Sequence, residues 1–146
     1  MSPAIEIKTQ YLRENGPICD VTIEPSSVTV DALKLEKKDV PWIKVKALVD
    51  TGASTTAISQ NVVDKLKLIS RGTATVHTSA KKTEIRNEYD VCVKFDSDSY
   101  VDILKVLGAN LQDHSIDCLI GMDILSYCTL TYIGPENQFT LSFGKD

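Results

Sequence analysis

The stretch "KALVDTGASTT", residues 46–56, decides the fold because it places an acid directly after an apolar run. Asp50 follows Ala47-Leu48-Val49, and a series of small hydroxyl residues and one glycine comes next. A carboxylate at the end of a buried strand is costly unless its surroundings use or satisfy the charge. Hydroxyls can supply hydrogen bonds, and glycine lets a second backbone come close. The stretch therefore predicts either a tight structural turn or a functional acid.

Size and composition indicate one globular domain. The chain has 146 residues, of which 42% are apolar and 25% charged, with a formal net charge of −4. No basic patch or stripe suggests a nucleic-acid partner. No apolar run approaches the roughly 18 residues that a membrane span needs. We therefore expect neither nucleic acid nor membrane as a partner.

Cysteine usage and the N-terminus favour a cytoplasmic protein. Four cysteines stand far apart and form no C-x-x-C pair: Cys19, Cys92, Cys118 and Cys128. The two histidines do not supply metal-ligand spacing beside them, so we predict no metal site, no cofactor and reduced core cysteines. The N-terminal segment is charged from Glu6 onward and lacks the apolar region of a signal peptide.

The dominant hydrophobic period is two, which predicts strands. The expected strands are "PICDVTIEP", "WIKVKALVD", "TATVHT", "YDVCVKF", "YVDILKVL", "YCTLTYI" and "QFTLSF". "DSDS" (96–99) and "GPEN" (134–137) are turn signals between neighbouring strands. Helix is scarce: 26–39 and 59–68 can each hold a short helix, and one turn can begin at Met122. The prediction is an all-β domain with one or two short helices.

A second segment, "DCLIGMDIL", follows Asp50 by about 70 residues. In it, Leu119-Ile120-Gly121 runs directly into the expected helical turn. An apolar pair followed by glycine lets one strand pass close behind another turn, because glycine has no side chain to clash. Asp123 lies in this segment, and we expect it to cap the helix or to face solvent.

With these two segments in order, the sequence resembles the retropepsin-like aspartic proteases, in particular small bacterial-type members with one D-T-G per chain. The resemblance covers roughly residues 17–143. It implies a retropepsin-like acid-protease half-barrel that is active as a homodimer. Residues 17–146 would form the protease domain, and residues 1–16 an N-terminal extension that is a candidate interface strand.

The resemblance also implies roles for individual residues. Asp50 would be the catalytic acid, paired across the dimer axis with Asp50 of a second subunit. The active-site loop would be supported by Thr51, Gly52, Ala53 and Ser54. Ile120 and Gly121 would form the strand behind the site. Two carboxylates this close share one proton, so one acts as base on a water and the other polarises the peptide carbonyl.

Three details depart from the family pattern or refine it. Met122 stands where many viral members carry arginine after the glycine, so the interface ion pair made by that arginine is absent. The flap should lie between Thr73 and Val91, and its tip "TSAKKTE" has no glycine. Ala53 stands where pepsins often carry a hydroxyl, so we expect activity from mildly acidic toward neutral pH.

Rival functions remain beside the endopeptidase that cuts extended peptides. One is a catalytically silent peptide-binding or dimerisation module with the same fold. A phosphate-loop enzyme of the actin and sugar-kinase group is excluded, because 146 residues cannot build its two large domains. A haloacid-dehalogenase-type phosphatase is excluded as well, since Gly52 stands where that chemistry needs a second aspartate.

Overall fold

The computed structural model describes residues 4–77, 81–96, 98–111 and 115–144. These residues form mostly strands, with four short α-helices and one 3-10 turn. In chain order the elements are β1 (Ala4–Lys8), α1 (Leu12–Asn15), β2 (Ile18–Pro25), α2 (Ser27–Leu35), β3 (Ile43–Val49), β4 (Ala57–Ser59), α3 (Gln60–Leu66), β5 (Gly72–His77), β6 (Thr83–Phe95), β7 (Tyr100–Ala109), β8 (Cys118–Ile120), α4 (Met122–Leu125), β9 (Cys128–Ile133), η1 (Gly134–Glu136) and β10 (Gln138–Phe143).

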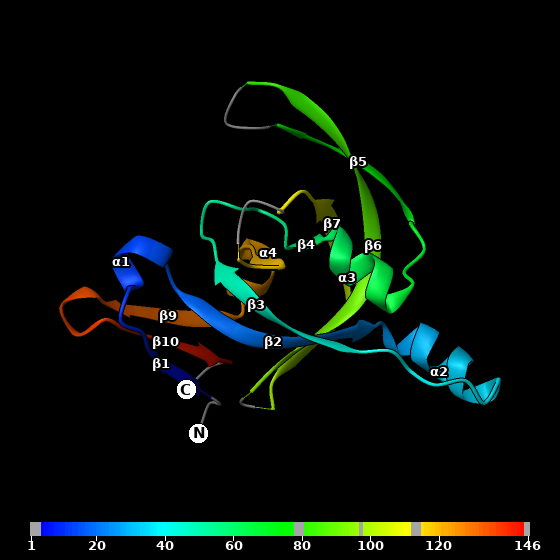
Figure 1. Ribbon diagram of the computed structural model, residues 1–146, viewed down its shortest axis with the longest axis horizontal. Helices are drawn as coiled ribbons and strands as arrows, with labels where there is room; N and C mark the ends of the chain where they lie inside the picture. The colour runs from blue at the N-terminus through cyan, green and yellow to red at the C-terminus, as the bar shows by residue number, and fades with distance from the viewer. Residues whose placement is uncertain (1–3, 78–80, 97, 112–114, 145–146) are drawn as a thin grey trace.

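The larger sheet closes on itself. Its strand order is β2-β3-β8-β4-β7-β6-β5, and β2 also pairs with β6. Figure 1 labels these strands except β8. Six strands therefore form a closed ring, with β5 outside it. The pairs β3–β8 and β4–β7 are parallel, and the other pairs are antiparallel. The ring closes because β2 is paired along both of its edges.

The core fills this ring. Strand β2 alternates partly buried and buried residues along its whole length, as period-two patterning requires. The fully enclosed large side chains come from most elements: Phe139, Leu12, Ile23, Ile58, Ile120, Ile124, Leu141, Val21, Val62, Val91, Val93 and Val106. Short strands and single turns of helix therefore share one continuous core.

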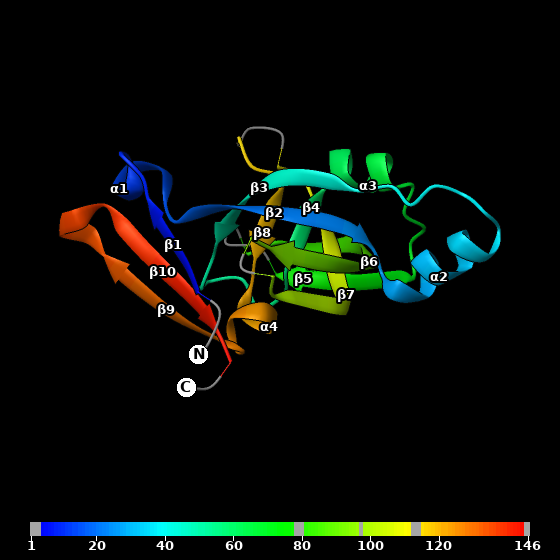
Figure 2. The same ribbon diagram turned by 90° about the horizontal axis from the view of Figure 1, so that it is seen from below.

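The chain ends form a second, three-stranded antiparallel sheet in the order β1-β10-β9. Figure 2 shows it beside the ring, tilted away from it. Phe139 and Leu141 of β10 are completely buried against the core, whereas Thr129 and Thr131 of β9 are exposed. Strand β1 lies in residues 1–16, the segment expected to be an N-terminal extension, and in one chain it pairs with β10 of its own sheet.

Helices are more numerous than the one or two predicted. Helix α3 begins after Ser59, whose Oγ accepts a hydrogen bond from Val62 N–H at 3.4 Å. Helix α2 lies within 26–39 and buries no residue, and α4 begins at Met122 as expected. Helix α1 was not predicted, because a single turn anchored by one buried residue, Leu12, carries no periodic signal.

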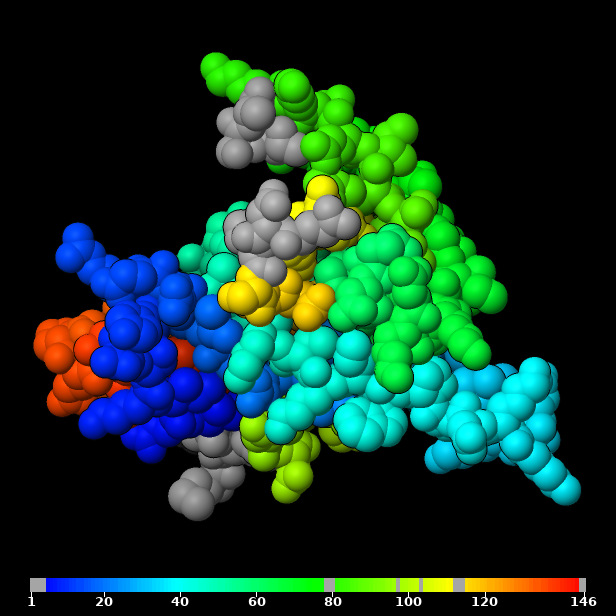
Figure 3. Space-filling view, viewed as in Figure 1, coloured from blue at the N-terminus to red at the C-terminus, as the bar shows by residue number. Residues whose placement is uncertain are grey.

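A long hairpin extends from the ring. Strands β5 and β6 pair from Gly72–Glu88 to His77–Thr83, and they arch over the centre of the molecule (Figure 1). In Figure 3 this green arm stands away from the centre, with a hollow beneath its free end. The hairpin occupies the predicted flap position. Residues 78–80 of the predicted tip, and residue 97 of the predicted turn at 96–99, lie outside the described residues.

The described residues contain no helix long and apolar enough to cross a membrane. Their four cysteines are free, and Cys19, Cys92 and Cys118 are buried. Burial raises the pKa of the Cys92 and Cys128 thiols to about 11. These thiols are therefore protonated near neutral pH and are poor nucleophiles.

Replacing Phe139 tests how the terminal sheet is attached. Phe139→Ala removes a fully buried ring, so the free energy of unfolding should fall by about 3–5 kcal/mol. Thr131→Ala, on the exposed face of β9, should change it by less than about 0.5 kcal/mol. Urea unfolding of both variants at one protein concentration checks this. Equal effects would mean that the terminal sheet does not pack on the core.

Candidate active site

Asp50 lies immediately after β3, where two parallel strands end side by side. Register pairs Val49 with Ile120, and the N–H of Asp50 donates to the carbonyl of Ile120 at 2.9 Å. Strand β8 thus fixes the backbone of the acid. The Asp50 side chain is partly buried, at the start of a loop that faces solvent.

The loop turns tightly around the carboxylate. The N–H of Gly52 donates to Asp50 Oδ1 at 2.9 Å, and the N–H of Ala53 donates to the carbonyl of Asp50 at 3.1 Å. Thr51, Gly52 and Ser54 are exposed, so this side of the loop is open to other molecules. Within the described part of the chain, these contacts orient Asp50, and its carboxylate accepts one hydrogen bond.

Gly121 passes directly behind the loop. A Cβ at this position would lie 2.7 Å from the carbonyl carbon of Thr55 and 2.9 Å from the carbonyl oxygen of Ala53. Two further bonds join the strands here: Met122 N–H donates to the Ala53 carbonyl at 2.8 Å, and Asp123 N–H donates to the Ser54 carbonyl at 3.2 Å. The predicted loop and the predicted strand behind it are therefore in direct backbone contact.

A hydrogen-bond network around the buried Thr56, which we call the Thr56 network, holds the same two segments. It consists of Thr56, Asp123 and Gly121. Thr56 Oγ1 donates to Asp123 Oδ1 at 2.7 Å and accepts from Gly121 N–H at 3.1 Å. The N–H of Thr56 donates to Asp123 Oδ2 at 3.0 Å. The completely buried Thr56 hydroxyl thus both donates and accepts a hydrogen bond.

Sequence reasoning missed this network. Asp123 was expected to cap the helix or to face solvent; one oxygen does accept from Ile124 N–H at 2.9 Å, yet both oxygens also bond Thr56. Thr56 was read only as one of several hydroxyl residues in the turn. The available signal was its position between exposed Ser54 and the apolar pair Ala57-Ile58, where a hydroxyl needs a buried partner.

The other nearby acid is also satisfied within the chain. Asp117 accepts from Ser59 Oγ at 2.7 Å, and its backbone bonds both Ser59 and Lys46. Asp123 is used by Thr56. Among the described residues, no second carboxylate is bonded to Asp50 or its loop from the open side. The same part of the chain holds no cluster of His, Cys, Asp or Glu that could bind a metal ion.

A pocket of about 390 Å³ lies between the loop after Asp50 (residues 51–56, the active loop) and the hairpin of β5 and β6 (the flap hairpin). Ser54 and Thr55 line it on the loop side, and Thr75 of β5 lines it on the flap side. The N–H of Leu107, another lining residue, donates to the Thr56 carbonyl at 3.0 Å. The pocket is thus built on the segment that positions Asp50, and it can hold a side chain of a bound molecule.

Gly121→Ala tests the close approach. The new methyl would overlap backbone atoms of Thr55 and Ala53, so stability should fall by about 1–3 kcal/mol or more. Gly108→Ala is the matched control, because its Cβ would meet a ring carbon of Tyr89 at 3.4 Å, which is ordinary contact. Chemical unfolding should therefore separate the two variants, and equal losses would contradict the geometry.

Thr56→Val tests the network without changing the side-chain volume. The Gly121 N–H and the Asp123 carboxylate would each lose a hydrogen-bond partner. The free energy of unfolding should therefore fall by about 1–3 kcal/mol. Ser54→Ala, at an exposed position two residues away, should lower the free energy of unfolding by less than about 0.5 kcal/mol. Thermal and urea unfolding check the difference, and a stable Thr56→Val variant would show that the hydroxyl is dispensable.

Comparison with known proteins agrees with this geometry. A family model described as gag-polyprotein putative aspartyl protease matches residues 40–127, from just before β3 to just after α4. The chain is similar to the crystal structure of a retropepsin-like aspartic protease from Rickettsia conorii, with a TM-score of 0.53 and 18% identity. That match covers 98% of this chain and 94% of the other. At such identity the likeness shows the fold alone.

Among curated proteins, no sequence matches. The family match nevertheless covers more than half of the chain and contains both Asp50 and Gly121. The chain belongs to the gag-polyprotein putative aspartyl protease family and has a retropepsin-like fold.

Proposed function

We propose that the protein is an aspartic endopeptidase whose active site is completed by a second copy of the chain. Each subunit contributes one Asp50, and the pair activates a water molecule. The observation that carries the proposal is the carboxylate of Asp50, oriented by Gly52 N–H at 2.9 Å on an open loop. Family membership supports the reaction class.

The proposed chemistry needs two carboxylates in different protonation states. Two Asp50 groups a few ångströms apart cannot both ionise at low cost, so they hold one proton between them. The ionised group removes a proton from the water molecule as the water oxygen attacks the peptide carbonyl carbon. The protonated group donates to the carbonyl oxygen, giving a gem-diol. When the C–N bond breaks, the carboxyl group that took the water proton passes it to the leaving nitrogen, and the other, now ionised, takes a proton from one gem-diol hydroxyl as the new C=O bond forms.

The arrangement of the acids supports a homodimer. Asp117 and Asp123 already bond hydroxyl groups of their own chain, so neither is suited to be the second catalytic acid. A twofold axis beside the open loop would bring the two Asp50 residues together. In this dimer, Thr51 of each exposed loop would brace the other loop.

The terminal sheet is the proposed source of dimer strength. Met122, which stands in place of the family arginine, bonds Ala53 through its backbone, and its apolar side chain is 45% exposed. The sheet order β1-β10-β9 leaves one edge of β1 and one edge of β9 without a neighbour among the described strands. Such edges can pair with a second chain.

Substrate would bind as an extended peptide. Strand β5 ends the order of the larger sheet, so its outer edge is available within the described part of the chain. An extended peptide can add to such an edge through backbone hydrogen bonds and place alternate side chains in pockets. The pocket beside Ser54 and Thr75 lies where one of those side chains would enter.

The alternative is a binding or dimerisation module that keeps the fold and cleaves nothing. The exposed β5 edge and the pocket suit peptide binding equally well. The open, oriented carboxylate favours the enzyme, because a binding module has no use for a close pair of acids, which would destabilise its dimer.

Asp50→Asn tests the proposal directly. The amide cannot act as base, so cleavage of a peptide library between about pH 3 and 8 should fall by at least a hundredfold. Mass spectrometry locates the cuts in wild type and variant. Asp31→Asn on exposed α2 is the matched acid-to-amide control and should leave every cut in place.

Subunit mixing tests the shared site. Wild type co-refolded with equal Asp50→Asn protein should keep about a quarter of the activity of an all-wild-type sample, since only dimers with two acids act. Half the activity would mean that each chain works alone. No cuts from a folded wild-type dimer would favour the binding module.

A further inference from the structure

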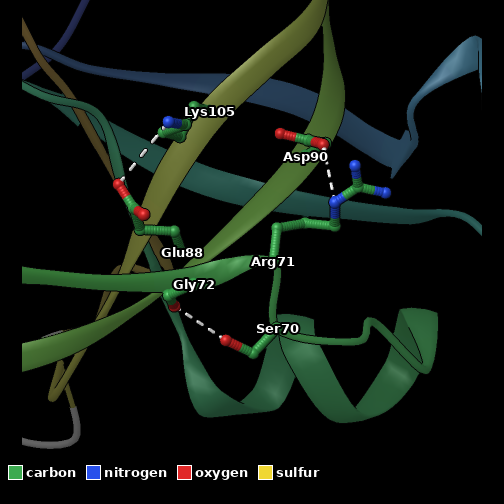
Figure 4. Close-up of polar contacts among 6 residues, drawn as sticks. All are labelled: Ser70, Arg71, Gly72, Glu88, Asp90 and Lys105. Carbon is green, nitrogen blue, oxygen red and sulfur yellow. Dashed lines mark hydrogen bonds and ion pairs between the residues drawn. The ribbon is translucent and has the colours of Figure 1, made fainter.

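The pocket between the active loop and the flap contains an asymmetric ion pair. Glu88 of β6 and Lys105 of β7 both line it, and Lys105 Nζ lies 3.9 Å from Glu88 Oε2. Figure 4 shows the two side chains turned toward each other from neighbouring strands. The side chain of Glu88 is only 18% exposed, whereas that of Lys105 is 63% exposed. The acid is therefore enclosed by the pocket wall, and the cation lies at its rim.

Two neighbours fix this arrangement. Gly72 lies opposite Glu88 in register, and a Cβ there would be 3.1 Å from Glu88 Oε1, so glycine leaves room for the carboxylate. Lys105 lies opposite Asp90, but Asp90 is paired with Arg71 at 3.5 Å. Lys105 is thereby left to the diagonal partner Glu88, as Figure 4 shows.

The carboxylate of Glu88 is poorly compensated by this partner. A separation of 3.9 Å is longer than a hydrogen bond, and Lys105 is the only cation paired with Glu88 among the described residues. An exposed lysine is screened by water and contributes little to such a pair. A second cation inside the pocket would gain a charge-assisted hydrogen bond with an acid that is already largely desolvated.

We propose that this pocket is a subsite that selects a basic side chain, lysine or arginine, of the substrate peptide. Glu88 is the specificity residue, and Lys105 is the counter-ion that the substrate displaces toward solvent. The inference rests on the proposed peptide-binding cleft. It adds a charge preference that follows from which of the two partners is enclosed.

The opposite preference is the rival outcome of the same geometry. If Lys105 dominated, an acidic side chain would be selected, and Glu88 would repel it. Exposure decides between them: moving the 63% exposed lysine away disturbs little, whereas the enclosed carboxylate stays in place.

The experiment uses sets of peptides that share one cleaved sequence and carry Lys, Gln or Glu at each position in turn. At the position that enters the pocket, wild type should prefer Lys over Gln by about tenfold in kcat/KM. Glu88→Gln should bring that ratio close to one. Lys105→Gln should raise the ratio, because the competing cation is gone.

Lys94→Gln, on the same strand as Glu88, is the matched control. It breaks a separate ion pair with Glu24, outside the pocket lining, and should leave the Lys-to-Gln ratio and the basal rate unchanged. An acidic preference lost in Lys105→Gln would overturn the inference. A preference for Lys at every peptide position that persists in the Glu88→Gln variant would overturn it as well.

Binding separates this inference from the proposed reaction. Fluorescence anisotropy of labelled Lys and Gln peptides on the Asp50→Asn protein, with and without Glu88→Gln, needs no cleavage. A Glu88-dependent preference for Lys in binding, with no cleavage by wild type, would support the subsite and refute the protease. Asp50-dependent cleavage without any Glu88-dependent charge preference would refute the subsite and keep the protease.

Discussion

The structure depends on one close approach, that of the Gly121 backbone to the loop after Asp50. Because no Cβ intervenes, carbonyl groups of residues 53 and 55 lie within 3 Å of where one would stand. Parallel pairing of β3 with β8 brings the two segments together, and Asp50 N–H bonds Ile120. Strand β4 then pairs with the other edge of β8, and α4 begins at once after the glycine. The absence of a side chain at Gly121 therefore allows β8, β4 and α4 to take their positions.

The same contact separates the acids of this region by role. Asp123 is pulled inward, because Thr56 presents both a backbone N–H and a hydroxyl to its carboxylate. Asp117 is held by Ser59, whose hydroxyl donates to the Asp117 carboxylate and whose N–H donates to the Asp117 backbone carbonyl. Among the described residues, the Asp50 carboxylate accepts one hydrogen bond, from Gly52 N–H, and Asp50 is only partly buried. An acid with spare acceptor capacity on a rigid backbone can react, whereas an acid saturated by hydroxyls stabilises.

Much of this arrangement was predictable from the sequence, since strands with one buried face carry a period of two. The alternation in 18–25 and 43–49 predicted β2 and β3, and Ser59 predicted the start of α3. Ring closure was not predictable, because the pairing of β2 with β6 joins residues about 70 positions apart without a local signal. The bond between Thr56 and Asp123 spans 67 residues and was missed for the same reason. Local pattern predicts elements, and tertiary partners decide what their polar residues do.

The exposure of Asp50 also changes the energetic argument that the sequence suggested. A fully buried unpaired carboxylate would destabilise the single chain, but Asp50 is only partly buried and keeps contact with water. The position of Asp50 therefore costs the single chain little on folding. In the proposed dimer the cost arises only on assembly, when two such groups lose water and must share a proton. The interface elsewhere has to compensate for that repulsion, and without the family arginine the compensation falls to backbone pairing at the edges of the terminal sheet.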